Sequence, residues 1–153
     1  MSDLTISSRI TPFLWFDDNA EEAVNFYLSV FKNSRKLGEF RGGPAPAGKP
    51  LTISFELEGI RFTALNGGPT YQFNPAISFV IGCASQDEID YFWSCLTADG
   101  GKEIQCGWLV DQFGVSWQVV PTNIADLLKS PKSVAAMMKM KKLDMNELKR
   151  AAE

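Results

Sequence analysis

The sequence predicts an α+β fold of two βαβββ modules, each forming an incomplete barrel, with helices at the C-terminus. Three observations carry this prediction. Strand-like runs alternate apolar and polar residues, helix-like stretches follow capping residues, and the same order of elements occurs twice. At 153 residues the chain is expected to form one domain over 1–153. Module 1 is expected at about 8–68, module 2 at about 74–121 and the helical tail at 122–153.

Module 1 is predicted to begin with an apolar strand over Ile10–Phe16. Asn19 followed by Glu22 is a capping-box pattern, which predicts the start of a helix whose apolar stripe ends near Phe31. Alternating apolar and polar residues then predict three more strands, with Gly59 in the turn between the last two. These strands are expected at 35–40, 51–58 and 61–66.

The loop between the second and third strands contains a pattern that needs an explanation. Gly43–Lys49 formally matches the G-x-x-x-x-G-K sequence of phosphate-binding loops. Pro50 replaces the Ser or Thr that would hold magnesium, and Pro44 and Pro46 lack the backbone donors such a loop needs. A strand, not a helix, is predicted to follow. The sequence therefore favours an ordinary hairpin loop.

Module 2 repeats the pattern of module 1. A strand over Ala76–Gly82 is followed by the capping box Ser85–Glu88 and an aromatic-rich helix that ends before Gly100. Strands are then expected at 102–106, 108–110 and 115–120, with a hairpin turn over Asp111–Gly114. Three further helices are predicted at 123–128, 133–140 and 145–152.

Composition restricts the chemistry that the chain can perform. The sequence has no histidine, which removes the usual base of Ser or Cys nucleophiles and the usual nitrogen ligand of metals. Three cysteines without a CxxC pair predict a reducing, cytoplasmic location without disulfides. No apolar run has the length of a membrane span. The acidic body, within a net charge of −3, argues against nucleic-acid binding.

Gln118 is a long polar side chain on one face of a largely apolar strand, so it needs a hydrogen-bond partner if it is buried. It is either a core amide with an internal partner or a residue that faces a ligand. In the second case we expect a cavity for a small organic molecule, with no cofactor. The residues expected to line it are Trp15, Asn66, Tyr71, Phe73, Trp108 and Gln118.

Two other function classes stay open at the level of the sequence. One is an enzyme without a metal that uses Cys106 or Asp111, both close to the predicted hairpin. The other is an interaction protein that acts through a homodimer or through its helical tail. The aromatic residues of the expected cavity can also belong to an ordinary core.

Several motifs resemble one known family. They are Ile10-Thr-Pro-Phe-Leu-Trp-Phe-Asp-Asp-Asn-Ala, Leu65-Asn-Gly-Gly-Pro69 and Cys106-Gly-Trp with Phe113-Gly-Val-Ser-Trp-Gln-Val-Val-Pro121. Together they resemble the PhnB-like branch of the vicinal oxygen chelate superfamily, which is glyoxalase-like and is often labelled 3-demethylubiquinone-9 3-methyltransferase-like. The resemblance implies paired βαβββ modules, a ligand cavity in each incomplete barrel and a homodimer.

Metal-dependent members of this superfamily carry His, Gln or Glu ligands on the first and last strands of each module. The corresponding positions here are near Pro12, Leu65 or Asn66, Ala76 and Gln118. At most two neutral amides are available, so the resemblance leads us to expect a cavity without a metal. A methyl donor would need a Gly-rich turn after the first strand, where this chain has Asp17–Asn19.

Overall fold

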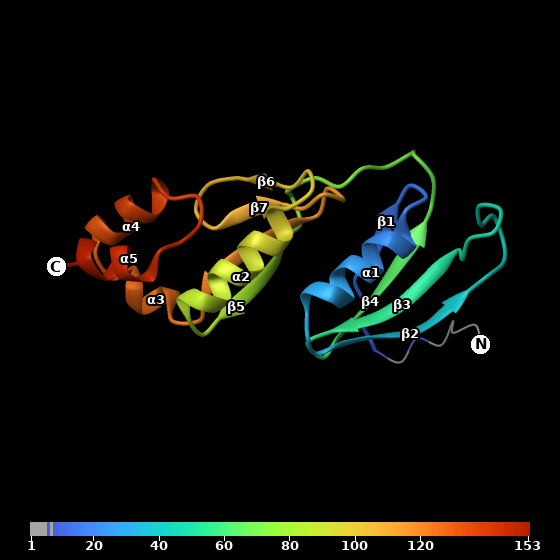
Figure 1. The fold of residues 1–153 in the computed structure, drawn as a ribbon, viewed down its shortest axis with the longest axis horizontal. Coiled ribbons are helices and arrows are strands. Elements are labelled where there is room, and N and C mark those ends of the chain that lie inside the picture. Colours follow the sequence, from blue (N-terminus) through green and yellow to red (C-terminus); the bar gives the residue numbers. More distant parts are fainter. Residues whose placement is uncertain (1–5, 7) are drawn as a thin grey trace. The chain divides into compact units, whose positions relative to one another are not determined.

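The computed structural model describes residues 6 and 8–153 of the chain, which divides into two compact units. The described residues up to Gln72 form unit 1, and Phe73–Glu153 forms unit 2. Each unit contains one four-stranded mixed sheet with the same topology, and in each the first strand is followed by a helix and three more strands (Figure 1). The predicted repeat of the βαβββ order is therefore confirmed, and so is the α+β class.

Unit 1 contains sheet A, in the strand order β1-β4-β3-β2. Its elements are β1 (Phe13–Phe16), α1 (Ala20–Val30), β2 (Ser34–Phe40), β3 (Thr52–Leu57) and β4 (Ile60–Asn66). β1 pairs with β4 in parallel, while the other pairs are antiparallel. Helix α1 buries its apolar stripe on this sheet, where Tyr27 stacks on Phe55 with ring centroids 6.4 Å apart.

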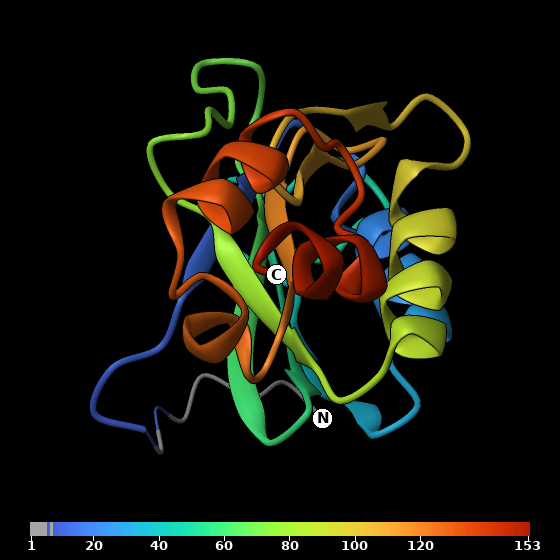
Figure 2. The same ribbon diagram turned by 90° about the vertical axis from the view of Figure 1, so that its left-hand side faces the viewer.

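Unit 2 contains sheet B, in the order β5-β8-β7-β6, and three short helices after it (Figure 2). Its elements are β5 (Phe79–Cys83), α2 (Gln86–Thr97), β6 (Lys102–Glu103), β7 (Trp108–Val110), β8 (Ser116–Pro121), α3 (Ile124–Leu127), α4 (Pro131–Met138) and α5 (Met145–Ala151). Helix α2 buries Ile89, Trp93 and Leu96 and packs on one face of the sheet.

The two predicted capping boxes differ in outcome. Ser85 caps α2 as expected, because its hydroxyl oxygen accepts the backbone N–H of Glu88 at 3.2 Å. At α1 the prediction was wrong: the Asn19 side chain makes no capping bond, and the Asn66 side-chain oxygen accepts the N–H of Ala20 at 2.9 Å. A residue from β4 therefore takes over the capping of the first helix.

Both first strands are shorter than the sequence predicts. β1 starts at Phe13 and not at Ile10, although the Pro12 carbonyl still accepts a hydrogen bond from Thr63 N at 3.0 Å. β5 starts at Phe79, and Ile77 before it is exposed. The predicted strand 102–106 is reduced to the two residues of β6, and α1 ends at Val30, so that Phe31 is its C-cap with an extended backbone.

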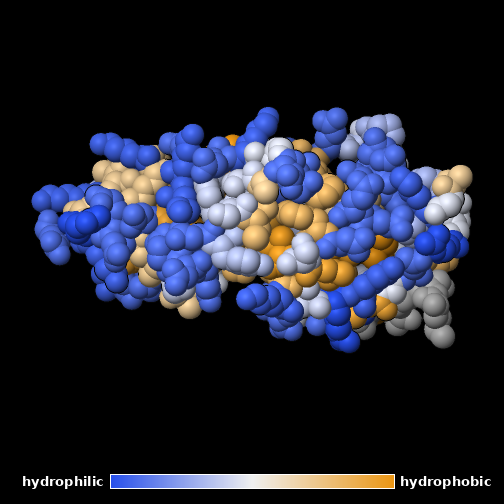
Figure 3. Space-filling view, viewed as in Figure 1, coloured by the Kyte–Doolittle hydropathy of each residue, from blue (hydrophilic) through white to orange (hydrophobic). Residues whose placement is uncertain are grey.

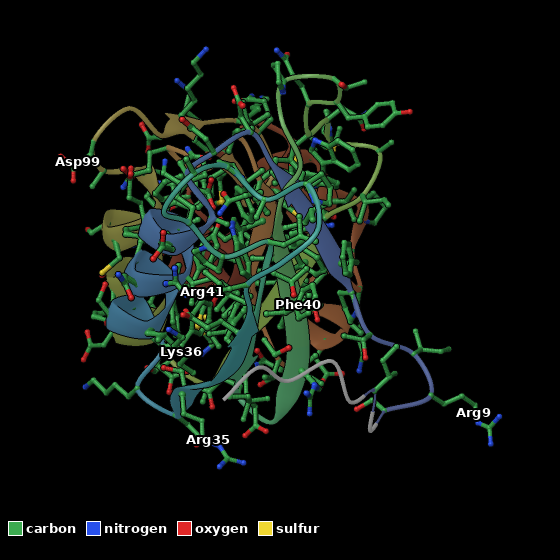
Figure 4. The ribbon with its side chains drawn as sticks, turned by 90° about the vertical axis from the view of Figure 1, so that its right-hand side faces the viewer. Arg9, Arg35, Lys36, Phe40, Arg41 and Asp99 are labelled. Carbon is green, nitrogen blue, oxygen red and sulfur yellow. The ribbon has the colours of Figure 1, made fainter. Side chains whose placement is uncertain are left out.

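The Gly43–Lys49 loop behaves as a connection between strands. It leads into β3, and the Lys49 ammonium donates to the Asp18 carbonyl oxygen at 2.8 Å, which fastens the end of the loop to the chain before α1. Lys36 of β2 and Arg41 just after this strand, both labelled in Figure 4, form ion pairs with Glu39 at 2.8 Å and 2.6 Å. These ion pairs lie at the outer edge of sheet A, where charged side chains discourage pairing with another strand.

The helical tail presents a mostly polar surface with a smaller apolar area. In Figure 3 hydrophilic residues surround this apolar area at the end of the molecule that holds α4 and α5. The lysines between and within these helices are exposed, and so are Val134 and Met138 of α4. Leu143 and Leu148 are buried and supply the apolar contacts of this region. No helix in the described part of the chain combines the length and the apolar character that crossing a membrane requires.

Candidate functional site

Sheet B has one face that α2 does not cover, and this face combines polar and apolar side chains. In the strand register Trp108 stands opposite Gln118, and Gln118 stands opposite Val80. In the next row Val110 stands opposite Ser116. Residues paired in this way lie on the same face of a sheet. We call the five residues Val80, Trp108, Val110, Ser116 and Gln118 the sheet B patch.

The burial of the residues on the opposite face of sheet B agrees with this assignment of the two faces. Leu109, Trp117 and Val119 alternate with the patch residues along β7 and β8, and all three are buried in the core beneath α2. The backbone alternation thus sends large apolar side chains toward the helix. The two polar side chains of β8 are sent to the other side.

The side-chain amide of Gln118 is held by a hydrogen bond at its nitrogen, and it uses only part of its hydrogen-bonding capacity. Its side-chain nitrogen donates to the Ser78 hydroxyl oxygen at 2.9 Å, and the side chain is half-buried. Among the described residues this is the one hydrogen bond that its side chain makes. The amide carbonyl oxygen therefore stays available to accept a bond from a ligand.

Ser116 is the second polar residue of the patch, and it lies deeper. Only 2% of its surface is exposed, and its hydroxyl has no hydrogen-bond partner among the described residues. Ser116 is not among the six residues that are predicted to line the cavity. The alternation of Ser116 with Gln118 in one strand was the signal that could have found it. Ser78 had no such signal, because the parallel pairing of β5 with β8 is not visible in local sequence.

In unit 1, Trp15 and Tyr71 form a separate aromatic pair. Their ring centroids are 4.8 Å apart in an edge-to-face arrangement, and the Trp15 indole N–H donates to the Gly68 carbonyl at 2.9 Å. The indole also lies close to Gly67, where a Cβ atom would come within 2.7 Å of three ring carbons. Tyr71 is 63% exposed. A ligand contact for this pair stays a prediction.

The Asn66 side chain is buried and makes hydrogen bonds to the backbone of its own unit. It is 3% exposed, its oxygen accepts the Ala20 N–H and its nitrogen donates to the Pro50 carbonyl at 2.9 Å. Both ends of the amide are thus bonded to the main chain, which ties β4 to the start of α1 and to the loop before β3. This geometry supports a role in folding, and a ligand role for Asn66 stays untested.

The six residues that the sequence proposed for one cavity are divided between the units. Trp15, Asn66 and Tyr71 belong to unit 1, whereas Phe73, Trp108 and Gln118 belong to unit 2. Phe73 lies beside the hairpin, where a Cβ on Gly114 would come 3.8 Å from its own Cβ. Within a single unit, the structure brings Trp108 and Gln118 side by side.

Asp111 and Cys106, the candidates for metal-free catalysis, lie at the two ends of β7. One Asp111 oxygen accepts the N–H groups of Phe113 and Val115, and the other accepts the Trp117 indole N–H at 2.9 Å. Cys106 is half-buried, with its sulfur 3.6 Å from the Met138 sulfur and its N–H bonded to the Met140 carbonyl. The Asp111 carboxylate thus organises the hairpin.

Cys83 in β5 predicts a measurable dependence of stability on pH. Burial raises the pKa of its thiol from 9.0 to about 11, and the nearby Glu88 carboxylate adds to the rise. Between these values the unfolded chain loses the proton while the folded chain keeps it. This contribution to stability is therefore complete below about pH 9 and is lost as the pH rises toward 11.

Urea unfolding at about pH 8 and about pH 10.5 measures this contribution. The free energy of unfolding should fall less between the two pH values in the Cys83→Ala protein than in the unchanged protein. Cys95→Ala, at a half-buried thiol, serves as the control. An identical fall in all three proteins would contradict the prediction.

Comparison with known proteins places the fold in a family. Residues 8–120 match the family model described as 3-demethylubiquinone-9 3-methyltransferase. A PhnB protein from Bacillus cereus is 32% identical, with 74% of this chain and 99% of that chain covered and a TM-score of 0.68. No curated protein matches.

More distant structures share the fold alone. A protein from Pseudomonas aeruginosa is 22% identical over 75% of this chain and 98% of its own, with a TM-score of 0.60. The fosfomycin resistance protein FosX from Mesorhizobium loti is 11% identical over 77% and 93%, with a TM-score of 0.54. Because the family model matches residues 8–120 and the Bacillus cereus PhnB protein is 32% identical, the chain belongs to the 3-demethylubiquinone-9 3-methyltransferase family, the PhnB-like branch of the vicinal oxygen chelate superfamily.

Proposed function

We propose that this protein binds a small organic molecule at the sheet B patch and does so without a metal ion. The observation that carries the proposal is the state of Gln118: one end of its amide is fixed by Ser78, while the carbonyl oxygen has no partner among the described residues. Trp108 and Val80 flank it with apolar surface. Apolar walls with a few oriented polar groups are typical of small-molecule sites.

The donor set of the chain supports binding without a metal. Metal-dependent relatives in the superfamily use His, Gln or Glu, and the equivalent positions here offer Pro12, Ala76 and the amides of Asn66 and Gln118. Asn66 is already bonded through both ends of its amide. The described residues contain no group of three or more His, Cys, Asp or Glu side chains arranged to hold an ion. These residues do not fit a divalent metal.

Methyl transfer, which the family description names, has no support in the local structure of unit 1. β1 is followed by Asp17, Asp18 and Asn19, and the N-terminus of α1 is capped by Asn66. Adenosyl-type donors are normally held at a Gly-rich turn that opens a helix in a parallel sheet. Both sheets here are mixed and are built largely from antiparallel pairs. We therefore propose binding in preference to methyl transfer.

The alternative of a metal-independent enzyme depends on Cys106 or Asp111. Asp111 accepts three hydrogen bonds inside its own hairpin, which favours a structural role. Cys106 contacts a thioether, and a thioether cannot act as a base for the thiol. Binding is therefore the better-supported function, and a homodimer stays a prediction of the family resemblance.

Protein-observed NMR with a library of uncharged and charged aromatic fragments, in the presence of a chelator, tests the proposal. Fragments that bind should shift resonances of the sheet B patch, and Gln118→Leu should weaken their binding about tenfold, which corresponds to the loss of one hydrogen bond. Gln105→Leu removes an exposed amide of the same unit and should leave binding unchanged. Binding that survives Gln118→Leu, or that needs an added divalent ion, would overturn the proposal.

A further inference from the structure

We infer that the ligand of the sheet B patch is a neutral, planar group that carries a hydrogen-bond donor and acceptor on one edge, as a carboxamide, lactam or imide does. This inference rests on the proposed function and narrows it to one chemical class. It depends on the juxtaposition of the unpartnered Ser116 hydroxyl, the free carbonyl oxygen of Gln118 and the Trp108 ring.

The Ser116 hydroxyl is the first step of the argument. It is almost completely buried, and it is bonded to nothing in the described part of the chain. Leaving a buried hydroxyl without a partner destabilises a folded protein, and an alanine would avoid that loss. A ligand that completes the hydrogen bond gives this side chain a function that alanine cannot perform.

The second step is the spacing of the two polar groups. Ser116 and Gln118 are alternate residues of β8, so they lie on the same face with Cα atoms about 7 Å apart. A ligand edge with a donor and an acceptor next to each other, each making a bond of about 2.9 Å, has the length to span this separation. An amide edge has such a pair of groups. A hydroxyl can donate or accept, so Ser116 suits either end.

The third step is the charge of the surroundings. None of the five patch residues is ionisable. Lys102 stands opposite Val110 on the same face, at the outer edge strand β6, and it is exposed to water. A carboxylate or ammonium group placed beside the buried Ser116 would lose its water without gaining a buried counter-charge, which is strongly unfavourable. Trp108 offers an aromatic surface on which a planar group can stack. A neutral planar ligand satisfies all these conditions.

Matched fragments test the chemical class. Benzamide, benzoate and N,N-dimethylbenzamide differ in charge and in the donor, and each can be titrated against the protein and followed by NMR. Benzamide is expected to bind at least tenfold more tightly than benzoate at neutral pH, and the dimethyl compound should also bind more weakly. A preference for benzoate, or the absence of binding by benzamide and by lactam and imide fragments, would overturn the inference.

A second measurement uses Ser116→Ala, for which stability and binding should change in opposite directions. The melting temperature of the ligand-free protein should rise by about 2–4 °C, since a buried orphan hydroxyl is removed. The affinity for benzamide should fall about tenfold. Ser133→Ala is the matched control, because Ser133 is equally buried but donates to the Ser130 carbonyl at 2.9 Å. This control should lower the melting temperature and leave binding intact.

A melting temperature that falls in Ser116→Ala, with unchanged affinity, would show that the hydroxyl has a structural partner and would overturn the inference. The outcomes also separate the two proposals. If binding depends on Gln118 but carboxylates bind more tightly than amides, the assignment of a neutral ligand is wrong, while the proposed binding function stands. If fragments of every class bind equally well to Gln118→Leu, the proposed function itself is wrong.

Discussion

Replacing Asp111 by alanine is expected to lower the free energy of unfolding by about 3–5 kcal/mol. Asp111 is 3% exposed, and its carboxylate accepts hydrogen bonds from two backbone N–H groups and from the Trp117 indole. Alanine would leave these donors without their partner inside the β7–β8 hairpin. Chemical unfolding followed by tryptophan fluorescence measures the loss, because Trp117 reports on the same hairpin.

Two further variants show whether the loss comes from this hydrogen-bond network. Asp111→Asn keeps an acceptor for Phe113 and Val115 but places an amide N–H₂ against the Trp117 N–H, so about 1–3 kcal/mol should be lost. Asp126→Ala removes an exposed ion pair with Lys129 and should cost less than about 1 kcal/mol. If Asp111→Ala proves as mild as Asp126→Ala, Asp111 does not hold the hairpin, and the catalytic alternative gains weight.

The repeated fold could be predicted because its signals are local. The Asp111–Gly114 turn between two apolar runs predicted the β7–β8 hairpin, and Ser85 with Glu88 predicted the start of α2. Gly59 also turns the chain as expected, with a φ of 82° at the hairpin between β3 and β4. In each case residues close in sequence determine the geometry, so patterns of spacing and turn chemistry are sufficient.

The errors in the prediction come from contacts between distant residues. Asn66 caps α1 from 46 positions away, so the local pattern at Asn19 could not reveal the true partner. Likewise the Gln118–Ser78 bond joins residues 40 positions apart through parallel strands. The alternation in β8 was enough to place Gln118 on a distinct face. It could not decide that Ser78 holds the amide or that Ser116 is left without a partner.

The loop that follows β4 gives the second large prediction: Gly67→Ala should destabilise the protein by about 3 kcal/mol. The new methyl carbon would lie 2.7 Å from Cδ2 and Cζ2 of the Trp15 indole, and closer still to Cε2. Because the indole is large and rigid, it would have to turn away from the loop. It would then lose its bond to the Gly68 carbonyl and its edge-to-face contact with Tyr71.

A double-mutant cycle identifies the indole as the cause, measured by urea unfolding. In the Trp15→Ala background the ring is absent, so Gly67→Ala should cost less than about 1 kcal/mol, which gives a coupling of about 2 kcal/mol between the two sites. Gly48→Ala, at a φ of 76° with no atom within 4 Å of the new Cβ, should cost about 1 kcal/mol through its left-handed backbone alone, a cost that Gly67 does not carry because its φ is not positive. Equal losses in both backgrounds would mean that the loop does not pack on Trp15. In that case the Trp15–Tyr71 pair would be free to rearrange around a ligand, and unit 1 would need to be reconsidered as a binding site.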